Sequence, residues 1–347
     1  MTVESVHLIN SYLEAHHNDA LLLVTRGVPA PSLSVERACD MIYTLCLTGQ
    51  AHRLTPDGAR AFWQYASSWS LAGGITAPAP GAPQANVHLT AYVLGALALL
   101  RDSGMPCAEP LFAKTGWAMV DIIDSDNVPR WPRKFSHHSW RVSHWVGGAA
   151  SIVYNLWRLA PKEAARQNVP APADVLTAAD RLVNPRNGLL KCYSSEFAQR
   201  VFKALYRIRH DPEAGEVGGI VHLHWVNYAT GRTPFKAAPP LFDRARKLYW
   251  KAPFLEKTPY CLDFDIVQIL RTSAPDRLTD PQILDRAKRF IDDIDLFFST
   301  SLDEQYALHK LPGALATQHE AASILGLDKF GSSDLRPIDI IKKAGWI

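Results

Sequence analysis

The segment WPRKFSHHSWRVSHW, residues 131–145, holds the densest group of side chains capable of chemistry in the sequence. On a helix, His137, Arg141 and His144 fall on one face because they are spaced four and three residues apart. An imidazole exchanges protons near neutral pH, and a guanidinium binds a carboxylate or phosphate. One such histidine is more often a hydrogen-bonded core residue. The cluster, however, indicates a site for an anionic substrate.

Other polar and aromatic groups stand near the starts of further predicted helices. They are His88 with Tyr92, His222 with His224, Trp225 and Tyr228, Tyr260 with Asp263 and Asp265, and His319 with Glu320. A closed layer of such helices would bring these starts to one mouth, where helix dipoles favour anions. We therefore expect these side chains to line one substrate site.

The two carboxylates near Tyr260 have structural and catalytic interpretations. Asp263 is typical of an N-cap, and Asp265 then falls in the first turn, where the dipole favours a carboxylate. The alternative makes Asp265 a general acid or base. Similarly, Thr317 and Glu320 match a capping box, which would explain Glu320 structurally and leave His319 as a candidate.

Metal and cofactor motifs are weak in this sequence. His222 and His224 are two residues apart, a spacing that suits a strand face or a chelate but points apart on a helix. The chain has no Gly-x-Gly-x-x-Gly turn, Walker loop, Gly-x-Ser-x-Gly elbow or His-Glu-x-x-His pair. We predict no cofactor and no metal ligand, with a divalent metal as the minor alternative.

Helical periodicity dominates the chain and alternates between two kinds of segment. Amphipathic candidates for outer helices are Ser5–His16, Asp57–Ser70, Ala108–Asp124, Ala173–Val183, Ser194–Arg209 and Pro281–Thr300. More apolar candidates for inner helices are Val35–Thr48, Asn86–Leu100, Ser139–Leu159, Gly219–Ala229, Asp263–Thr272 and Thr317–Leu325. The recurrence, about every fifty residues, is typical of stacked helical hairpins. It predicts an all-α protein, an (α/α)6 toroid formed by residues 1–347 as a single domain. An irregular helical bundle is the alternative.

Composition sets further bounds. Of 347 residues, 47% are hydrophobic, enough for a substantial core, and the net charge of +3 is too small to indicate a nucleic-acid partner. The longest apolar run, Ala91–Leu100, is too short to span a bilayer, and the first residues do not resemble a signal peptide. The five cysteines include no Cys-x-x-Cys pair, which favours free thiols. We predict a cytoplasmic protein and leave its oligomeric state open.

The repeated inner-helix pattern resembles the (α/α) toroid enzymes, which include polysaccharide lyases, uronate epimerases and glycoside hydrolases, and also the terpene cyclases. SHHSWRVSHW resembles the histidine- and aromatic-rich inner helix of the toroidal lyases, which pair a His or Tyr base with Asn or Arg. This resemblance implies His138 or His144 as base, Arg141 as carboxylate binder, and Tyr92 or Tyr228 as a further catalytic group. A hydrolase would instead need two carboxylates, Asp265 with Glu320. LDFDIVQILR resembles the Asp-x-Asp-Asp motif of class II cyclases, with Asp265 as the acid.

The combined prediction is an enzyme that uses general acid/base chemistry on an acidic or polyhydroxylated small molecule or oligosaccharide. His138, His144, Asp265 and Tyr92 would be catalytic, and Trp140, Trp145 and Trp225 would stack on the substrate. A cyclase that protonates a prenyl substrate is one alternative, and a non-catalytic helical binding scaffold is another.

Overall fold

The computed structural model describes residues 1–68, 87–105, 139–191, 196–205, 212–232, 238–251, 253–331 and 333–347. In these ranges the regular secondary structure is helical, and the β-type pairing is an isolated bridge between Val183 and Leu190. The all-α prediction is therefore confirmed for the described part of the chain. None of the helices described there combines the length and the hydropathy that a membrane span requires.

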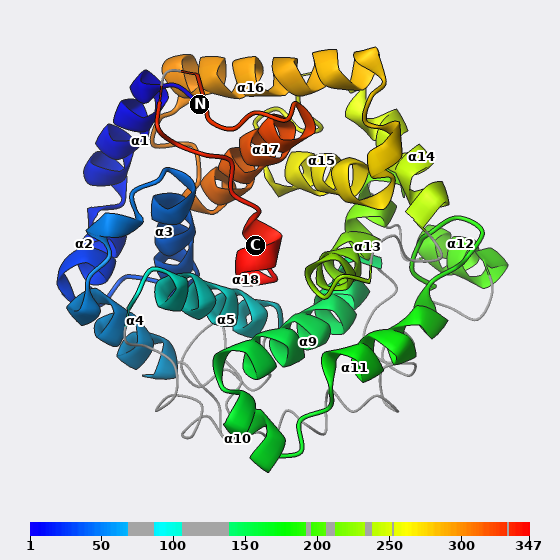
Figure 1. Cartoon of the computed structure of the whole chain (residues 1–347), viewed down its shortest axis with the longest axis horizontal. Helices are drawn as coiled ribbons and strands as arrows, with labels where there is room; N and C mark the ends of the chain where they lie inside the picture. The colour runs from blue at the N-terminus through cyan, green and yellow to red at the C-terminus, as the bar shows by residue number, and fades with distance from the viewer. Residues whose placement is uncertain are drawn as a thin grey trace.

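An inner layer of helices surrounds the middle of the molecule in Figure 1. Its members are α3 (Val35–Leu47), α5 (Val87–Asp102), α9 (Ser139–Leu159), α13 (Pro212–Ala229), α15 (Cys261–Ser273) and α17 (Leu311–Ile324). Each of these helices contacts the next in this order, and α17 contacts α3. The inner helices expected from the sequence therefore all exist, and α9 has the predicted bounds.

An outer layer covers the inner helices (Figure 1). Its helices are α1 (Val3–His16), α2 (Asn18–Arg26), α4 (Pro56–Ser68), α10 (Pro161–Arg166), α11 (Pro172–Ala179), α12 (Glu196–Leu205), α14 (Ala238–Tyr249) and α16 (Pro281–Ser301). The sequence patterns did not predict α2, α10 or α14. The predicted helix Ala108–Asp124 lies outside the described residues.

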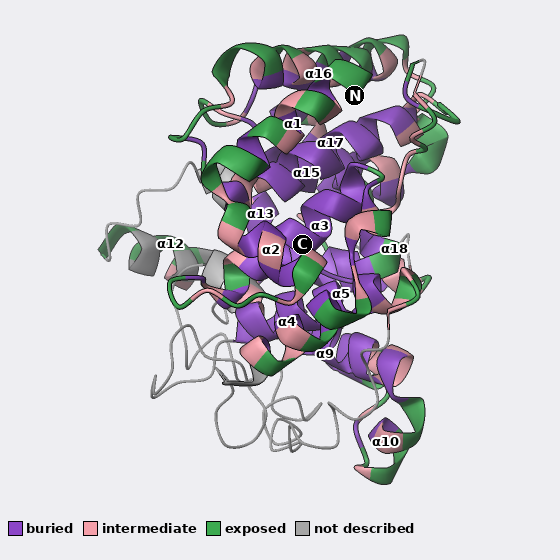
Figure 2. Cartoon of the chain, turned by 90° about the vertical axis from the view of Figure 1, so that its left-hand side faces the viewer, coloured by how far each residue is buried: buried purple, intermediate pink, exposed green. Residues whose placement is uncertain are grey.

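The two layers differ in burial, as Figure 2 shows. Almost every residue of α17 is buried, which is typical of a helix that other elements cover on all sides. Helix α16 instead buries one stripe, which includes Ile283, Ala287, Phe290 and Ile294, and exposes its other face. The outer layer therefore shields the inner one from solvent.

Two of the helix starts differ from the sequence prediction. Tyr260, not Asp263, is the N-cap of α15. Asp263 lies three residues further along, inside the helix, and its carboxylate accepts the Tyr260 N–H at 3.2 Å. Helix α17 begins at Leu311, so Thr317 lies mid-helix and donates to the Gly313 carbonyl at 2.8 Å. The capping-box interpretation of Glu320 is therefore wrong.

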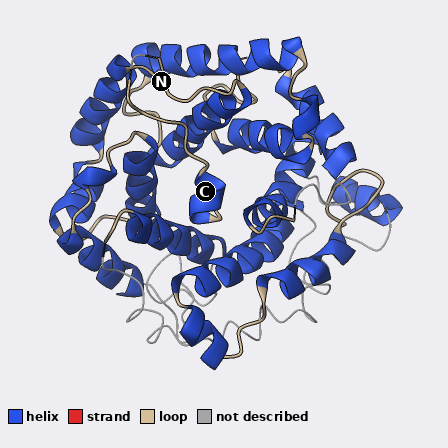
Figure 3. Ribbon diagram, in the orientation of Figure 1, coloured by secondary structure: helices blue, strands red, loops and turns tan. Residues whose placement is uncertain are grey.

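The C-terminal segment enters the middle of the inner layer. It crosses one face as a loop and then forms α18 (Ile340–Ala344), which contacts α5 and α13 (Figures 1 and 3). Side chains of α9 hold its backbone: Asn155 Nδ2 donates to the Ala344 carbonyl at 2.8 Å, and Ser151 Oγ donates to the Gly345 carbonyl at 3.0 Å. The residues that follow α18 therefore face the inner helices.

Candidate functional site

Three histidines from consecutive inner helices meet near the C-terminal segment. His88 lies on α5, His144 on α9 and His222 on α13, and one nitrogen from each falls within 4.8 Å of the others. The His88 and His144 rings stack with centroids 4.3 Å apart, and the His222 ring stands edge-on to His144 at 4.9 Å. We call these residues the three-histidine cluster.

Two adjacent glycines of α9 bring the helices of this cluster together. A Cβ atom on Gly147 would lie 2.5 Å from the His222 Cβ and 2.7 Å from the His222 carbonyl carbon. A Cβ atom on Gly148 would lie 3.0 Å from Cγ1 of Val87, next to His88 in the sequence. Helix α9 can therefore approach both neighbours closely only because these positions lack side chains.

Trp346 covers the cluster from the middle of the molecule. Its ring is fully buried, its Nε1–H donates to Nδ1 of His88 at 3.2 Å, and it stacks on His222 with centroids 4.5 Å apart. Tyr43 Oη donates to the Trp346 carbonyl at 2.7 Å and fixes the backbone there. The cluster is therefore an imidazole surface closed on one side by an indole.

A fourth histidine, His309, extends this surface. The Tyr92 ring lies between the two parts, with its centroid 6.5 Å from that of His88 and 6.0 Å from that of His309. Nδ1 of His309 and the Tyr92 hydroxyl both donate to Oδ1 of Asp40, at 3.0 Å and 2.6 Å. We call His222, His144, His88 and His309 together the imidazole row.

The surroundings of the histidines in the imidazole row favour different charge states at its two ends. Burial lowers the pKa of His88 and His222 well below the ordinary value, and the neighbouring His144 lowers both further. Burial acts the same way on His309, but the Asp40 carboxylate outweighs it and raises the pKa of His309 to about 9. The row therefore presents an imidazolium at one end and neutral imidazoles at the other.

The side chain of His309 is 35% exposed, whereas Asp40 is fully buried. A buried carboxylate needs a charged or hydrogen-bonded partner, and His309 and Tyr92 supply both. The Tyr92 hydroxyl is thus engaged with Asp40, and burial raises the pKa of this phenol further above its usual range. Tyr92 therefore positions Asp40, and His309 is the accessible proton donor of the group.

Asp265 is buried, not placed at a solvent-facing mouth as the sequence suggested. Burial raises its pKa well above the ordinary value, and the adjacent Asp263 carboxylate adds to the shift. Its Oδ1 atom has no hydrogen-bond partner among the described residues. Burial therefore favours the neutral carboxylic-acid form of Asp265.

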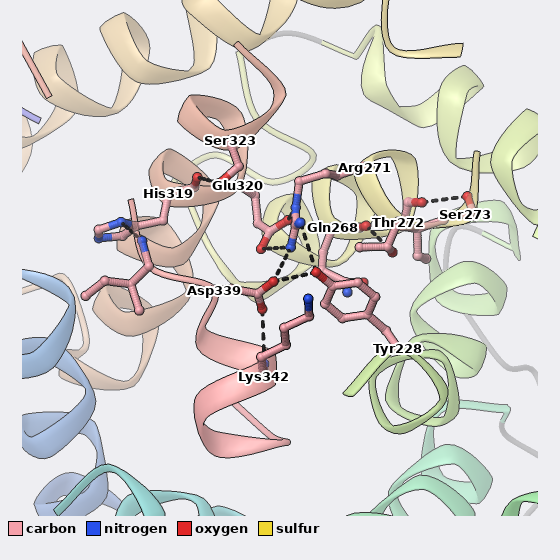
Figure 4. A network of polar contacts seen from close by, with 12 residues as sticks. Tyr228, Gln268, Arg271, Thr272, Ser273, His319, Glu320, Ser323, Asp339 and Lys342 are labelled. Atoms are coloured by element: carbon pink, nitrogen blue, oxygen red, sulfur yellow. Dashed lines mark hydrogen bonds and ion pairs between the residues drawn. The ribbon is translucent and has the colours of Figure 1, made fainter. Parts of the chain in front are cut away.

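Two predicted site residues, Tyr228 and Glu320, belong to a separate network, which Figure 4 shows. Arg271 donates to both carboxylate oxygens of Glu320, to Asp339 at 2.9 Å and to the Tyr228 hydroxyl at 3.0 Å. The Tyr228 hydroxyl in turn donates to Asp339 at 2.5 Å. We call Tyr228, Arg271, Glu320 and Asp339 the anchor network, because Asp339 leads into α18.

Two further predicted histidines, His319 and His224, have hydrogen-bond partners within the core. Nε2–H of His319 donates to the Leu47 carbonyl at 2.7 Å, and Nδ1 accepts the Ile338 N–H at 3.0 Å. Burial lowers the pKa of His319 to about 4 and that of His224 to about 3. His224 Nε2 lies 2.7 Å from Oγ1 of Thr272, on the side of α13 away from His222. Neither imidazole joins the row.

The remaining predicted residues divide into two groups. Trp225 is buried against His222 and Trp346, and Asp263 accepts backbone N–H groups of Leu255 and Tyr260. His137 and His138 lie outside the described residues, as do the side chains of Trp140, Arg141 and Trp145. The structure thus unites His88, Tyr92, His144 and His222 and separates His224, His319 and Glu320 from them.

Sequence analysis missed Asp40, His309 and Trp346. Asp40 lies in the middle of the apolar segment Val35–Leu47, and an acidic residue inside such a helix is a usable signal for a buried polar site. His309 lies on the short 3-10 helix Leu308–Lys310 before α17, where no local pattern marks it. Comparison with family models, curated proteins and solved structures returned no significant match to this chain.

Proposed function

We propose that this chain is an enzyme of the (α/α)6 toroid class that performs general acid/base chemistry on an acidic carbohydrate. The observation that carries the proposal is the His309–Asp40 pair at the end of the imidazole row. A buried carboxylate holds a partly exposed imidazole in its protonated form, which is the arrangement of a general acid that can also bind an anion.

The inner helices support the toroid part of the proposal. They contact one another in chain order, and the last of them contacts the first, as a closed layer of hairpins requires. The imidazole row draws on α5, α9, α13 and the turn before α17, so residues far apart in sequence converge on one region. Such convergence of ionisable groups is typical of catalytic sites.

The charged groups beside His309 are one further cation, Lys310, and two carboxylates, Asp40 and Glu36, which lie 3.0 Å and 3.8 Å from its Nδ1. Lys310 follows His309 directly, and its Nζ lies 5.6 Å from the centroid of the Tyr260 ring. The Tyr260 ring also lies 6.3 Å from that of His309. Two adjacent cations next to an aromatic face suit a ring that carries a carboxylate, such as a uronate.

The carboxylates favour proton transfer of the lyase or epimerase kind over hydrolysis. A glycosidase needs two carboxyl groups that flank the scissile bond. Glu320, one of the two that the sequence offered, has both oxygens bound by Arg271 in the anchor network. The hydrolase alternative therefore lacks its second carboxylate, whereas the imidazole row needs none beyond Asp40.

One observation favours a second function, a cyclase that protonates a prenyl substrate. Asp265 is a buried carboxyl group whose pKa is raised, so it carries a proton that it could deliver to an alkene. In this alternative Asp265, and not His309, is the acid. The two functions therefore predict different essential residues and different ligands.

A ligand screen separates these functions. We expect uronic-acid oligosaccharides to raise the melting temperature and prenyl diphosphates to leave it unchanged. With the best oligosaccharide, turnover should be followed by ultraviolet absorbance of an unsaturated uronate product and by NMR for epimerisation. His309→Gln should lower kcat by about 100-fold or more, the usual contribution of a general acid.

His7→Gln is the matched control, because His7 is exposed on α1 and far from the row in the chain. It should keep full activity and the same melting temperature. Stabilisation by prenyl diphosphates, together with activity that survives His309→Gln but not Asp265→Asn, would replace the carbohydrate proposal with the cyclase.

A further inference from the structure

We propose that His88, His144 and His222 bind a divalent transition-metal ion, for which zinc is the best match. This inference goes beyond the proposed function, which places the acid at His309 and Asp40. It rests on the convergence of three imidazoles from three separate inner helices, within 4.8 Å of one another at their ligand atoms.

The distances require only a modest contraction. Zinc–nitrogen bonds of about 2.0–2.1 Å in a tetrahedral site hold the ligand nitrogens about 3.4 Å apart. His88 and His144 are only partly buried, and their rings stack 4.3 Å apart. Rotation of these two rings toward the buried His222 would bring the three ligand nitrogens closer together.

The backbone beneath the cluster is built for this approach. Gly147 lets α9 touch α13 at His222 itself, and Gly148 lets α9 touch α5 at Val87, beside His88. His144 lies one turn before both glycines on the same helix. The three Cα positions are therefore fixed by helix packing, which provides the preorganised first shell that a metal centre needs.

The donor set selects the class of metal. Among the described residues the donor set is three imidazole nitrogens without a carboxylate, which suits Zn²⁺, Co²⁺, Ni²⁺ or Cu²⁺, and not Mg²⁺ or Ca²⁺, which need oxygen ligands. Three protein ligands leave one tetrahedral position for water or substrate, as catalytic zinc sites do.

Metal binding must break one contact seen in the structure. The Trp346 Nε1–H donates to Nδ1 of His88 at 3.2 Å, which requires a lone pair on that nitrogen. If Nδ1 binds the metal, the lone pair is used, and if Nε2 binds it, Nδ1 of the neutral ring carries the proton. In either case the Trp346 indole loses its acceptor and must shift, which makes it a reporter of metal binding.

The test is direct metal binding by the full chain. After treatment with a chelator, calorimetric titration should show one Zn²⁺ per chain with a Kd below about 1 μM, and Co²⁺ should give a visible spectrum typical of tetrahedral nitrogen ligands. His88→Ala and His144→Ala should each weaken binding by about 100-fold or more. Both side chains are partly exposed, and circular dichroism checks that the variants fold.

His309→Gln is the matched control, because His309 belongs to the same imidazole row but not to the cluster. It should bind Zn²⁺ as the unaltered chain does and lose only the acid/base activity, so failure of the metal proposal and failure of the proposed function give different results. No stoichiometric binding by the unaltered chain, or full binding by His144→Ala, would overturn the metal centre.

Trp346 provides a second readout that does not depend on activity. Zinc should change the tryptophan emission of the unaltered chain, and Trp346→Phe should remove that change while keeping one zinc per chain. An unchanged zinc-dependent difference in Trp346→Phe would place the ion away from this indole, against the proposal.

Discussion

The anchor network and the imidazole row are two polar clusters that inner helices hold inside the same protein, yet the contacts described within them are of different kinds. In the anchor network, Arg271 binds both oxygens of Glu320 as well as Asp339 and Tyr228. In the row, the rings of His88, His144 and His222 meet mainly through their faces and edges.

Under the proposed function, the anchor network has a structural role and the imidazole row forms the site. Charge-assisted hydrogen bonds that fill each partner's capacity fix geometry, and they leave nothing to bind a ligand. Two imidazoles of the three-histidine cluster are partly exposed, and an imidazole can exchange a proton or bind a metal. Both clusters contain residues that the sequence marks as capable of chemistry, so residue type alone does not distinguish them.

The largest effect is expected from breaking the anchor network. Glu320→Ala removes the main partner of Arg271, whose side chain is 16% exposed while that of Glu320 is 1% exposed. The loss of one member of a buried ion pair leaves an uncompensated charge, and we expect about 3 kcal/mol less stability, since Asp339 still binds Arg271. Urea unfolding followed by circular dichroism measures this loss.

Asp243→Ala is the control, since the Asp243–Arg277 pair has the same chemistry on the surface, with side chains 62% and 50% exposed. An exposed pair contributes little, so the unfolding midpoint should barely move. Equal effects of the two substitutions would show that burial does not set the strength of the anchor network.

A smaller effect is expected from Gly147→Ala at the base of the imidazole row. The new methyl group would lie 2.5 Å from the His222 Cβ, so α9 and α13 must separate. Overpacking of this kind costs about 2 kcal/mol even after the higher helix propensity of alanine is counted. Urea unfolding gives the stability, and zinc titration of the same variant should show weaker binding.

Gly148→Ala is the comparison variant, for which we expect a smaller loss of stability than for Gly147→Ala. Its methyl group would meet the end of the Val87 side chain at 3.0 Å, which can move, so its stability loss should be smaller. If Gly147→Ala were the milder of the two, the close approach at His222 would not be what holds the cluster together.

Periodicity predicted most of the fold, because burial on one or all sides leaves a direct pattern in the sequence. It located the inner helices and gave α9 its observed bounds. The start of α17 was placed six residues late, since Thr317 and Glu320 imitate a capping box. Helix α14 was also missed, although its buried residues Leu241, Phe242, Ala245, Leu248 and Tyr249 follow a regular helical stripe.

The site was predictable only in part. His88, His144 and His222 stood out because imidazoles recur on inner helices, but which of them face one another depends on helix rotation and packing. Trp346 contacts His88 across 258 residues of chain, and no local signal encodes such a contact. His319 and Glu320 looked equally promising, and only their observed partners, Leu47, Ile338 and Arg271, assign them to structure.

The smallest expected effect is a pH dependence that distinguishes the row from the anchor network. Because the folded-state pKa of His309 is about 9, above the 6.5 of an unfolded chain, its pairing with Asp40 stabilises the protein fully below pH 6.5. That contribution is lost as the pH rises through 9. His309 is 35% exposed, so solvent screening reduces it to about 1 kcal/mol.

Other groups titrate in the same range, so the measurement is the difference in unfolding free energy between the unaltered chain and His309→Gln at pH 6, 7.5 and 9.5. This difference should shrink as the pH rises. A constant difference for His309→Gln would mean that Asp40 does not hold His309 protonated. The row would then carry no acid at that end, and the proposed catalysis would lose its proton donor.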